Sequence, residues 1–128
     1  SGIIENTVLE MCKLGASADN ICCVIGPAIA QQSYEVDADF RENILVKNKL
    51  AHKCFFPNVV SRKANSDKKF LFDLHEYCKI ELKRLCVDHY ANINKDTYQN
   101  RELFYSYRLS YHEGKSKYGR QISIIGIK

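Results

Sequence analysis

Apolar residues recur at helical spacing in three segments of the chain. The first is residues 3–14, which Gly15 follows as a C-terminal stop, and the second is residues 38–50. The third begins at Asp73, which forms a capping-box-like start with Glu76, and extends to about residue 87. The positions that these predicted helices turn inward are Ile4, Val8, Met11 and Cys12 in the first, Phe40, Ile44 and Leu45 in the second, and Leu74, Cys78, Leu82 and Leu85 in the third.

Four other segments have the pattern of β-strands. Residues 21–25 are continuously apolar, which is typical of a strand buried on both faces. Residues 89–94 predict a short strand, and residues 103–108 are rich in aromatic side chains, which favour strands. Residues 121–127 alternate in polarity and predict a final strand. Because helices and strands interleave, the predicted fold class is α/β or α+β, with a mixed β-sheet flanked by helices.

Two segments are predicted loops. Residues 54–69 contain Pro57 and a long polar run, and residues 110–119 have the composition of a turn or hairpin loop. No internal repeat, low-complexity tract or Pro/Ser-rich linker divides the sequence. Residues 1–128 therefore predict a single domain.

Composition and charge restrict the protein class without naming a function. The 128 residues are 45% hydrophobic and 27% charged with a net charge of +4, which is typical of a globular domain and too weakly basic to indicate nucleic acid by itself. No apolar run is long enough to cross a bilayer and no secretory signal pattern is present, so we expect a cytoplasmic protein that binds no membrane. The six cysteines are too sparse for a disulfide scaffold and are expected to be reduced.

Histidine and cysteine residues offer one candidate metal site. His52 and Cys54 form an H-x-C pair, and His75 and Cys78 form an H-x-x-C pair, with the nitrogen and sulfur ligands that suit zinc. However, Cys78 lies on the apolar stripe of its helix, and neither pair has the spacing of a zinc finger. Core cysteines and surface histidines are the favoured interpretation.

Two further patterns favour a solvated surface over a functional site. His112 and Glu113 could act in general acid–base chemistry, but they lie in a polar segment that predicts an exposed loop. The basic residues would form a phosphate-binding surface if they converged, but no recognised nucleic-acid motif accompanies them. These basic residues are Arg62, Lys63, Lys68, Lys69, Lys79, Lys83, Arg84, Lys115, Lys117 and Arg120.

Three stretches carry a more specific signal. Residues 24–36 have the sequence VIGPAIAQQSYEV, residues 103–108 have LFYSYR, and residues 118–125 have YGRQISII. In order and spacing they resemble the C-terminal half of the laccase-domain family, also called multicopper polyphenol oxidases, purine nucleoside phosphorylases or peptidoglycan-editing factors. The resemblance covers nearly the whole chain and implies a laccase-domain/cytotoxic-necrotizing-factor-like architecture.

The chain departs from the family pattern at three positions. Ala28 and Ser33 stand where the family has cysteines, and Leu109 stands where it has a second arginine. The family's zinc- or copper-binding His/Cys/His set lies in its N-terminal half, in T-A-D-C and H-A-G-W-R-G motifs. The resemblance thus implies that the N-terminal half is missing here, and that this chain holds neither metal ligands nor catalytic residues.

The matched residues are the candidate substrate-binding residues of this chain. Gly26 permits backbone conformations that a Cβ forbids, and Pro27 fixes the turn after a buried strand, which places the following loop where α/β sites form. Tyr34 could stack or pack, and Glu35 could accept a hydrogen bond. Arg108 is a candidate for binding phosphate or carboxylate, with an internal ion pair as the equally weighted alternative.

The resemblance implies a function for the intact family: phosphorolysis of adenosine, inosine and methylthioadenosine, with adenosine deamination as a side activity. We expect this chain to be an incomplete member that is inactive alone. The alternative is a non-enzymatic remnant or interaction module that pairs with a separately encoded N-terminal half, or forms a homo-oligomer. A small basic nucleic-acid binder is the weakest hypothesis. Purine nucleoside and phosphate are the expected ligands of a completed protein.

Overall fold

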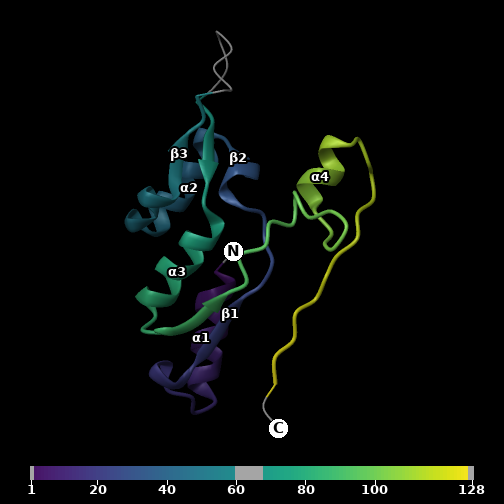
Figure 1. The fold of residues 1–128 in the computed structure, drawn as a ribbon. Helices are drawn as coiled ribbons and strands as arrows, with labels where there is room; N and C mark the ends of the chain where they lie inside the picture. The colour runs from purple at the N-terminus through teal and green to yellow at the C-terminus, as the bar shows by residue number, and fades with distance from the viewer. Residues whose placement is uncertain (1, 60–67, 127–128) are drawn as a thin grey trace.

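Two small β-sheets form the centre of the fold in the computed structural model, which describes residues 2–59 and 68–126 (Figure 1). Short 3₁₀ helices connect the main elements at Ala18–Asn20 (η1), Gln31–Ser33 (η2) and Lys49–Cys54 (η3). The main elements in chain order are α1 (Ile3–Lys13), β1 (Cys22–Ile25), β2 (Glu35–Val36), α2 (Ala38–Lys47), β3 (Phe55–Pro57), β4 (Phe70–Phe72), α3 (Leu74–Arg84), β5 (His89–Asn92) and α4 (Tyr107–His112).

The two sheets differ in strand direction. β1 and β5 pair in parallel, with Cys22 opposite His89 and Ile25 opposite Asn92. The other sheet is antiparallel in the order β2-β4-β3. A single parallel bridge between Ala28 and Asp96 continues the contact beyond the ends of β1 and β5. The mixed α/β class expected from the sequence is confirmed, although its strands form two sheets rather than one.

Each sheet has its own hydrophobic cluster. Helices α1 and α3 cover one face of the β1–β5 sheet, where Val8, Ile25 and Leu82 are buried together. The antiparallel sheet buries Phe72 among aromatic rings, with the ring centroid of Phe55 at 4.7 Å and that of Phe40 at 5.3 Å. Edge-to-face and tilted contacts of this kind add to the stabilisation that comes from buried area.

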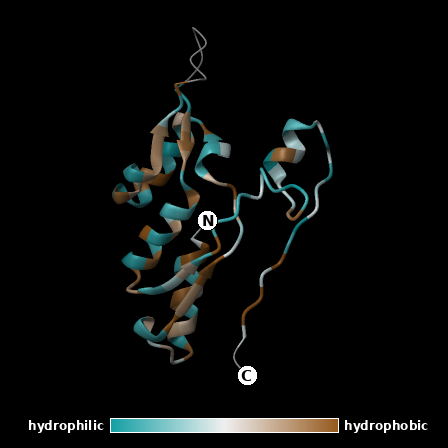
Figure 2. Ribbon diagram, in the orientation of Figure 1, coloured by the Kyte–Doolittle hydropathy of each residue, from teal (hydrophilic) through white to brown (hydrophobic). Residues whose placement is uncertain are grey.

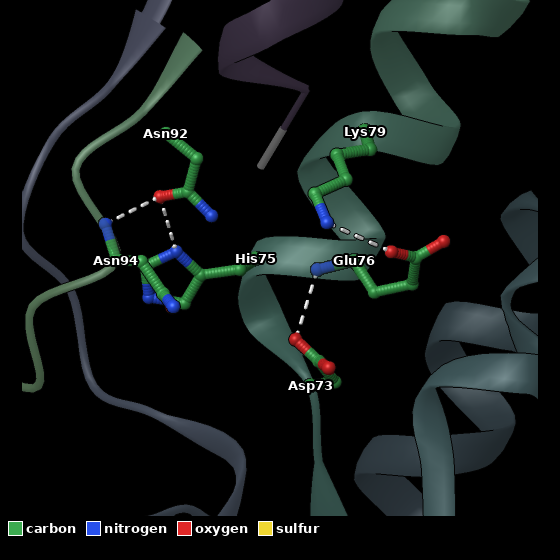
Figure 3. A network of polar contacts seen from close by, with 6 residues as sticks. All are labelled: Asp73, His75, Glu76, Lys79, Asn92 and Asn94. Carbon is green, nitrogen blue, oxygen red and sulfur yellow. Dashed lines mark hydrogen bonds and ion pairs between the residues drawn. The ribbon is translucent and has the colours of Figure 1, made fainter.

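Helix α3 begins as the sequence predicts. The Asp73 carboxylate accepts a hydrogen bond from the Glu76 backbone N–H at 2.9 Å, which satisfies a donor that has no partner within the helix (Figure 3). The Asp73 N–H in turn donates to the Cys54 carbonyl at 2.8 Å, which ties the helix start to the end of η3. In the first turn, His75 is buried with Nδ1 2.9 Å from Asn92 Oδ1, so the cap also positions a contact to the end of β5.

Several sequence predictions of burial and strands are wrong. β1 is buried on one face only, because Cys22 and Val24 point to the uncovered face of the sheet. In α1, Met11 and Cys12 are exposed although Val8 is buried and Ile4 is half-buried, so the buried stripe of this helix ends one turn early. Gly15 does end the helix, with a left-handed φ of 99°.

The aromatic segment 103–108 is not a strand. Ser106 caps α4 instead, with its hydroxyl accepting from the Leu109 N–H, and the helix then runs to His112 inside the predicted loop 110–119. β-propensity describes how well side chains fit a half-buried sheet surface, and no strand lies beside this segment among the described residues. In the predicted loop 54–69, Phe55–Pro57 forms β3, and residues 60–67 of that loop lie outside the described part.

The predicted final strand is also wrong. Residues 121–126 belong to no strand, and Ile127 lies outside the described residues. Ile122 and Ile124 are 83% and 84% exposed, and Figure 2 shows apolar colour along this C-terminal segment. The alternating pattern is present in the sequence, but no strand of the described chain pairs with this segment.

Within residues 2–59 and 68–126, none of the helices has the length and apolar character needed to cross a membrane.

The helix cap can be tested by substitution. Asp73→Ala removes the acceptor for the Glu76 N–H and is expected to lower the free energy of unfolding by about 1 kcal/mol. Asp73→Asn keeps a side-chain oxygen at the same place and should lie within a few tenths of a kcal/mol of the parent. Urea unfolding followed by circular dichroism measures both. Equal losses for the two variants would contradict the capping role.

Candidate functional site

Arg108 joins α4 to β2. Its Nη1 donates a hydrogen bond of 2.8 Å to the Glu35 carbonyl, and its guanidinium carbon lies 5.3 Å from the centroid of the Tyr34 ring. The face of a tyrosine ring attracts a cation, and burial by the surrounding residues makes that attraction stronger than in water. Burial also raises the pKa of the Tyr34 hydroxyl, and the charge of Arg108 opposes this rise. The structure therefore brings together three of the five predicted substrate-binding residues.

Two cavities meet at Arg108. The larger has a volume of 540 Å³ and aromatic walls from Tyr34, Phe40, Tyr107 and Tyr111. The smaller has a volume of 360 Å³, and its lining is Gln32, Ser33, Glu35, Asn58, Leu71, Tyr98, Gln99, Arg108 and His112. Aromatic rings in one open cavity, with hydroxyl, amide and charged groups in the next, suit a ligand with a flat ring and a polar, hydroxylated part.

The buried carboxylate of Asp96 holds the loop that carries Tyr34 and Glu35. It accepts hydrogen bonds from the Ala30 N–H at 3.2 Å, the Ser33 hydroxyl at 2.6 Å and the Tyr98 N–H at 2.8 Å. Sequence reasoning missed Asp96, because its partners on the loop are more than 60 residues away in the chain. The local signal was an aspartate that accepts from its own backbone two residues on, which is typical of a turn.

Gly26 and Pro27 occupy a different part of the structure. They follow the C-terminal end of β1 as predicted, but neither lines the two cavities at Arg108. Gly26 does not use the left-handed backbone region, so the conformational reason for a glycine is wrong. An added Cβ there would lie 3.4 Å from Ser123 Oγ, which is an ordinary van der Waals contact, so the C-terminal segment does not require a glycine at this position either.

His112 and Glu113 lie at the end of α4, not in a hairpin loop. Tyr98 Oη is 2.9 Å from His112 Nδ1, and His112 lines both cavities. Glu113 forms an ion pair with Lys115 at 2.6 Å, and the hydrogen bond from Lys115 lowers the pKa of the Glu113 carboxyl. The His112 and Glu113 side chains therefore have different partners: His112 lines the cavities and contacts Tyr98, and Glu113 pairs with a surface lysine.

The residues present do not fit the metal centre that the family implies. No group of three or more His, Cys, Asp and Glu side chains within the described chain could hold a metal ion. Burial raises the pKa of the Cys54 thiol to about 12 and that of Cys78 to about 11, which keeps both protonated and poor as ligands. His75 Nε2 is buried and has no hydrogen-bond partner in residues 2–59 and 68–126, but it is a single ligand atom.

Several of the predicted basic residues lie in ion pairs. Lys79 pairs with Glu76, and Lys115 pairs with Glu113. Arg84 pairs with both Glu5 and Glu81, which raises its pKa. Arg62 and Lys63 of the predicted basic set lie outside the described residues. Ion pairing on Lys79, Arg84 and Lys115 reduces the attraction of these side chains for a nucleic-acid backbone.

The role of Asp96 can be tested by stability. Asp96→Ala leaves two backbone N–H groups and one hydroxyl without their acceptor, so we expect the free energy of unfolding to fall by about 2–4 kcal/mol. Asp39→Ala is a control on the exposed surface of α2, with an expected change within about 0.5 kcal/mol. Denaturant unfolding measures both, and a similar loss in the two variants would refute the role of Asp96.

Thiol reactivity tests the burial of the cysteines. Alkylation proceeds through the thiolate, so the raised pKa values of Cys54 and Cys78 predict slow reaction at mildly alkaline pH. The exposed residues Cys12, Cys22 and Cys86 are expected to react first. Timed iodoacetamide labelling with peptide mass spectrometry gives the order, and guanidinium chloride should make all six equivalent. Labelling of Cys54 as fast as Cys86 in the folded protein would contradict the structure.

Comparison of the sequence with known proteins identifies its family. The model of the family described as multi-copper polyphenol oxidoreductase laccase matches residues 1–128. Purine nucleoside phosphorylase RP494 of Rickettsia prowazekii is 38% identical over 112 residues, which are 88% of this chain and 43% of the relative. Purine nucleoside phosphorylase of Haemophilus influenzae is 27% identical over 124 residues, which are 97% of this chain and 46% of the relative.

A third relative, purine nucleoside phosphorylase PA4543 of Pseudomonas aeruginosa, is 26% identical over 128 residues, all of this chain and 47% of the relative. The chain thus spans less than half the length of the curated relatives it matches. The match over the whole sequence confirms the resemblance carried by the Gly-Pro loop and the Ser-Tyr-Arg segment. The chain belongs to the multi-copper polyphenol oxidoreductase laccase family.

Proposed function

We propose that this chain supplies part of the substrate site of a purine nucleoside phosphorylase and is inactive without a complementary polypeptide. The observation that carries the proposal is the position of Arg108, which contacts Tyr34 and Glu35 and lines two cavities, the larger of which has aromatic walls. The reaction is taken from the relatives, which are named purine nucleoside phosphorylases.

The chemistry of phosphorolysis matches what these cavities offer. An oxygen of inorganic phosphate forms a bond to C1′ of the ribose, the bond from C1′ to the purine nitrogen breaks, and the base leaves with that electron pair and takes up a proton. A purine can stack on the rings of Tyr107 and Tyr111, and ribose hydroxyls can bond to side chains such as Ser33 and Gln99. The N–H groups of Arg108 suit the phosphate.

Two observations support the proposal that the chain alone is inactive. The relatives contain more than half of their length outside the matched region. The described residues of this chain include no cluster of metal ligands. We therefore place the zinc or copper and its ligands, where the completed enzyme uses them, on the complementary polypeptide, and we assign no step of the reaction to a metal held by this chain.

The open face of the β1–β5 sheet supports a complementary polypeptide. Parallel strands occur almost only in sheets that are covered on both faces, and α1 and α3 cover one face here. The other face presents Cys22, Val24 and Ala91, all exposed, and Ile93 beyond β5 is 49% exposed. A layer supplied by the complementary polypeptide would bury these side chains and give the sheet its second face.

The same open face is the one observation that favours a second candidate function. A non-enzymatic module that only pairs with another chain would also need an uncovered apolar surface. It would not need Arg108 to lie beside two cavities. The two candidates therefore differ in whether substitution of Arg108 affects anything besides assembly.

Complementation tests the proposal. This chain is mixed with the separately expressed portion of the Rickettsia prowazekii relative that has no counterpart here, and release of purine base from inosine, adenosine and methylthioadenosine is followed with and without phosphate. We expect no turnover from this chain alone and phosphate-dependent turnover from the mixture. Arg108→Ala should lower turnover by about 10²-fold without preventing assembly.

Arg120→Ala is the matched control. Arg120 also lies over a tyrosine ring, 5.1 Å from the centroid of Tyr118, but it lines neither cavity at Arg108. Its substitution should leave turnover unchanged. Assembly without turnover would favour the non-enzymatic module, and robust turnover by this chain alone would refute the need for a complementary polypeptide.

A further inference from the structure

His112 shares the candidate site with Arg108. The two residues are four positions apart on α4, which places them on one face of the helix, and both line both cavities. The sequence favoured a solvated histidine because the surrounding segment is polar. In the folded chain the ring is exposed to solvent but also reachable by anything that occupies either cavity.

Tyr98 fixes the orientation of the His112 ring. Tyr98 Oη lies 2.9 Å from His112 Nδ1, and the two rings meet at 77° with their centroids 5.6 Å apart. The Tyr98 N–H donates to the buried carboxylate of Asp96, so Tyr98 is itself anchored. Because Tyr98 engages Nδ1, Nε2 is the ring nitrogen that remains for a ligand.

The carboxylates on the cavity walls already accept hydrogen bonds. Asp37 accepts from the Phe40 N–H at 2.8 Å and caps α2, and Glu35 Oε2 accepts from Asn58 Nδ2 at 2.6 Å. The other charged side chains of the larger cavity are Lys69 and Arg108, which are donors only. The two carboxylates keep their negative charge, so an oxyanion is expected to lie against Lys69, Arg108 and His112, whose N–H groups can donate to its oxygens.

We infer that Arg108 and His112 together bind inorganic phosphate. Arg108 uses Nη1 for the Glu35 carbonyl and keeps its other N–H groups for the anion. His112 donates through Nε2, because a hydroxyl proton given by Tyr98 to Nδ1 leaves the ring proton on Nε2. The choice of phosphate as the anion rests on the phosphorolysis proposed above. Tyr98 is a positioning residue, since it acts on the ligand only through His112.

Direct binding to this chain tests the inference without any need for turnover. Sodium phosphate is titrated at constant ionic strength into the isotopically labelled chain, and the side-chain histidine resonances are followed by NMR. We expect saturable shifts of the His112 resonances, with equivalent sodium chloride producing none. His112→Ala should raise the phosphate Kd by about tenfold, which corresponds to one hydrogen bond to a charged group. Tyr98→Phe should raise it severalfold while His112 still responds.

His52→Ala is the matched control. His52 is also an exposed histidine with Nδ1 in a hydrogen bond, to the Lys49 carbonyl, but it lines neither cavity at Arg108. Its substitution should leave the phosphate Kd unchanged. The absence of saturable binding, or the same Kd in His112→Ala as in the parent, would overturn the inference.

The complemented enzyme separates this inference from the proposed function. If His112 binds phosphate, His112→Ala in the mixture should raise the KM for phosphate much more than it lowers kcat. Turnover with an unchanged phosphate KM would overturn the role of His112 and leave the phosphorylase proposal standing. Phosphate binding that depends on His112, in a mixture that never turns over, would retain the anion site and refute phosphorolysis.

Discussion

The candidate site depends on the buried carboxylate of Asp96. A carboxylate taken out of water loses its hydration, and only close hydrogen-bond donors compensate for that loss. Here the donors are Ala30 and Ser33 on the loop after β1, and Tyr98 just after Asp96 itself. One side chain therefore fixes two distant segments at once. Tyr34 and Glu35 follow Ser33 directly, so this contact sets their position together with β4, whose Phe72 N–H donates to the Tyr34 carbonyl.

The segments that Asp96 holds are in turn the ones that contact α4. The 34–35 segment presents the ring and the carbonyl that hold Arg108, and Tyr98 presents the hydroxyl that holds His112. α4 has six residues, which is fewer than two turns and too short to be stable by itself. The contacts of Arg108 and His112 and the Ser106 cap set the position of this helix, rather than a large apolar face. Such a helix can shift slightly with an occupant of the cavities, since few buried contacts resist it.

Local signals predicted the helices well and the C-terminal third poorly. Asp73 with Glu76, and Gly15, act through bonds to neighbours in the chain, so their sequence pattern is sufficient. The aromatic run 103–108 and the alternating isoleucines at 121–127 favour strands, but a strand also needs a neighbour with complementary hydrogen bonds, and the described chain offers none there. Arg108, Tyr34 and Glu35 were predicted as site residues through the family resemblance. Asp96 and Tyr98 were not, because their roles depend on which distant segments meet.

The departures from the family pattern fit this hydrogen-bonded arrangement. Ser33 stands where the family has a cysteine, and its hydroxyl is a much better donor to the Asp96 carboxylate than a thiol would be. Ala28 stands at the other cysteine position, where only its backbone is used: its N–H donates to the Lys95 carbonyl and its carbonyl accepts from the Thr97 N–H. A methyl side chain meets that requirement without adding a polar atom. These two substitutions replace the thiols of this loop with a hydroxyl and a methyl group, and the loop they produce is held by oxygen and nitrogen contacts that need no metal and no thiolate. The 34–35 segment and α4 therefore meet through a hydrogen bond and a cation–π contact of Arg108, with the loop before them held by Asp96.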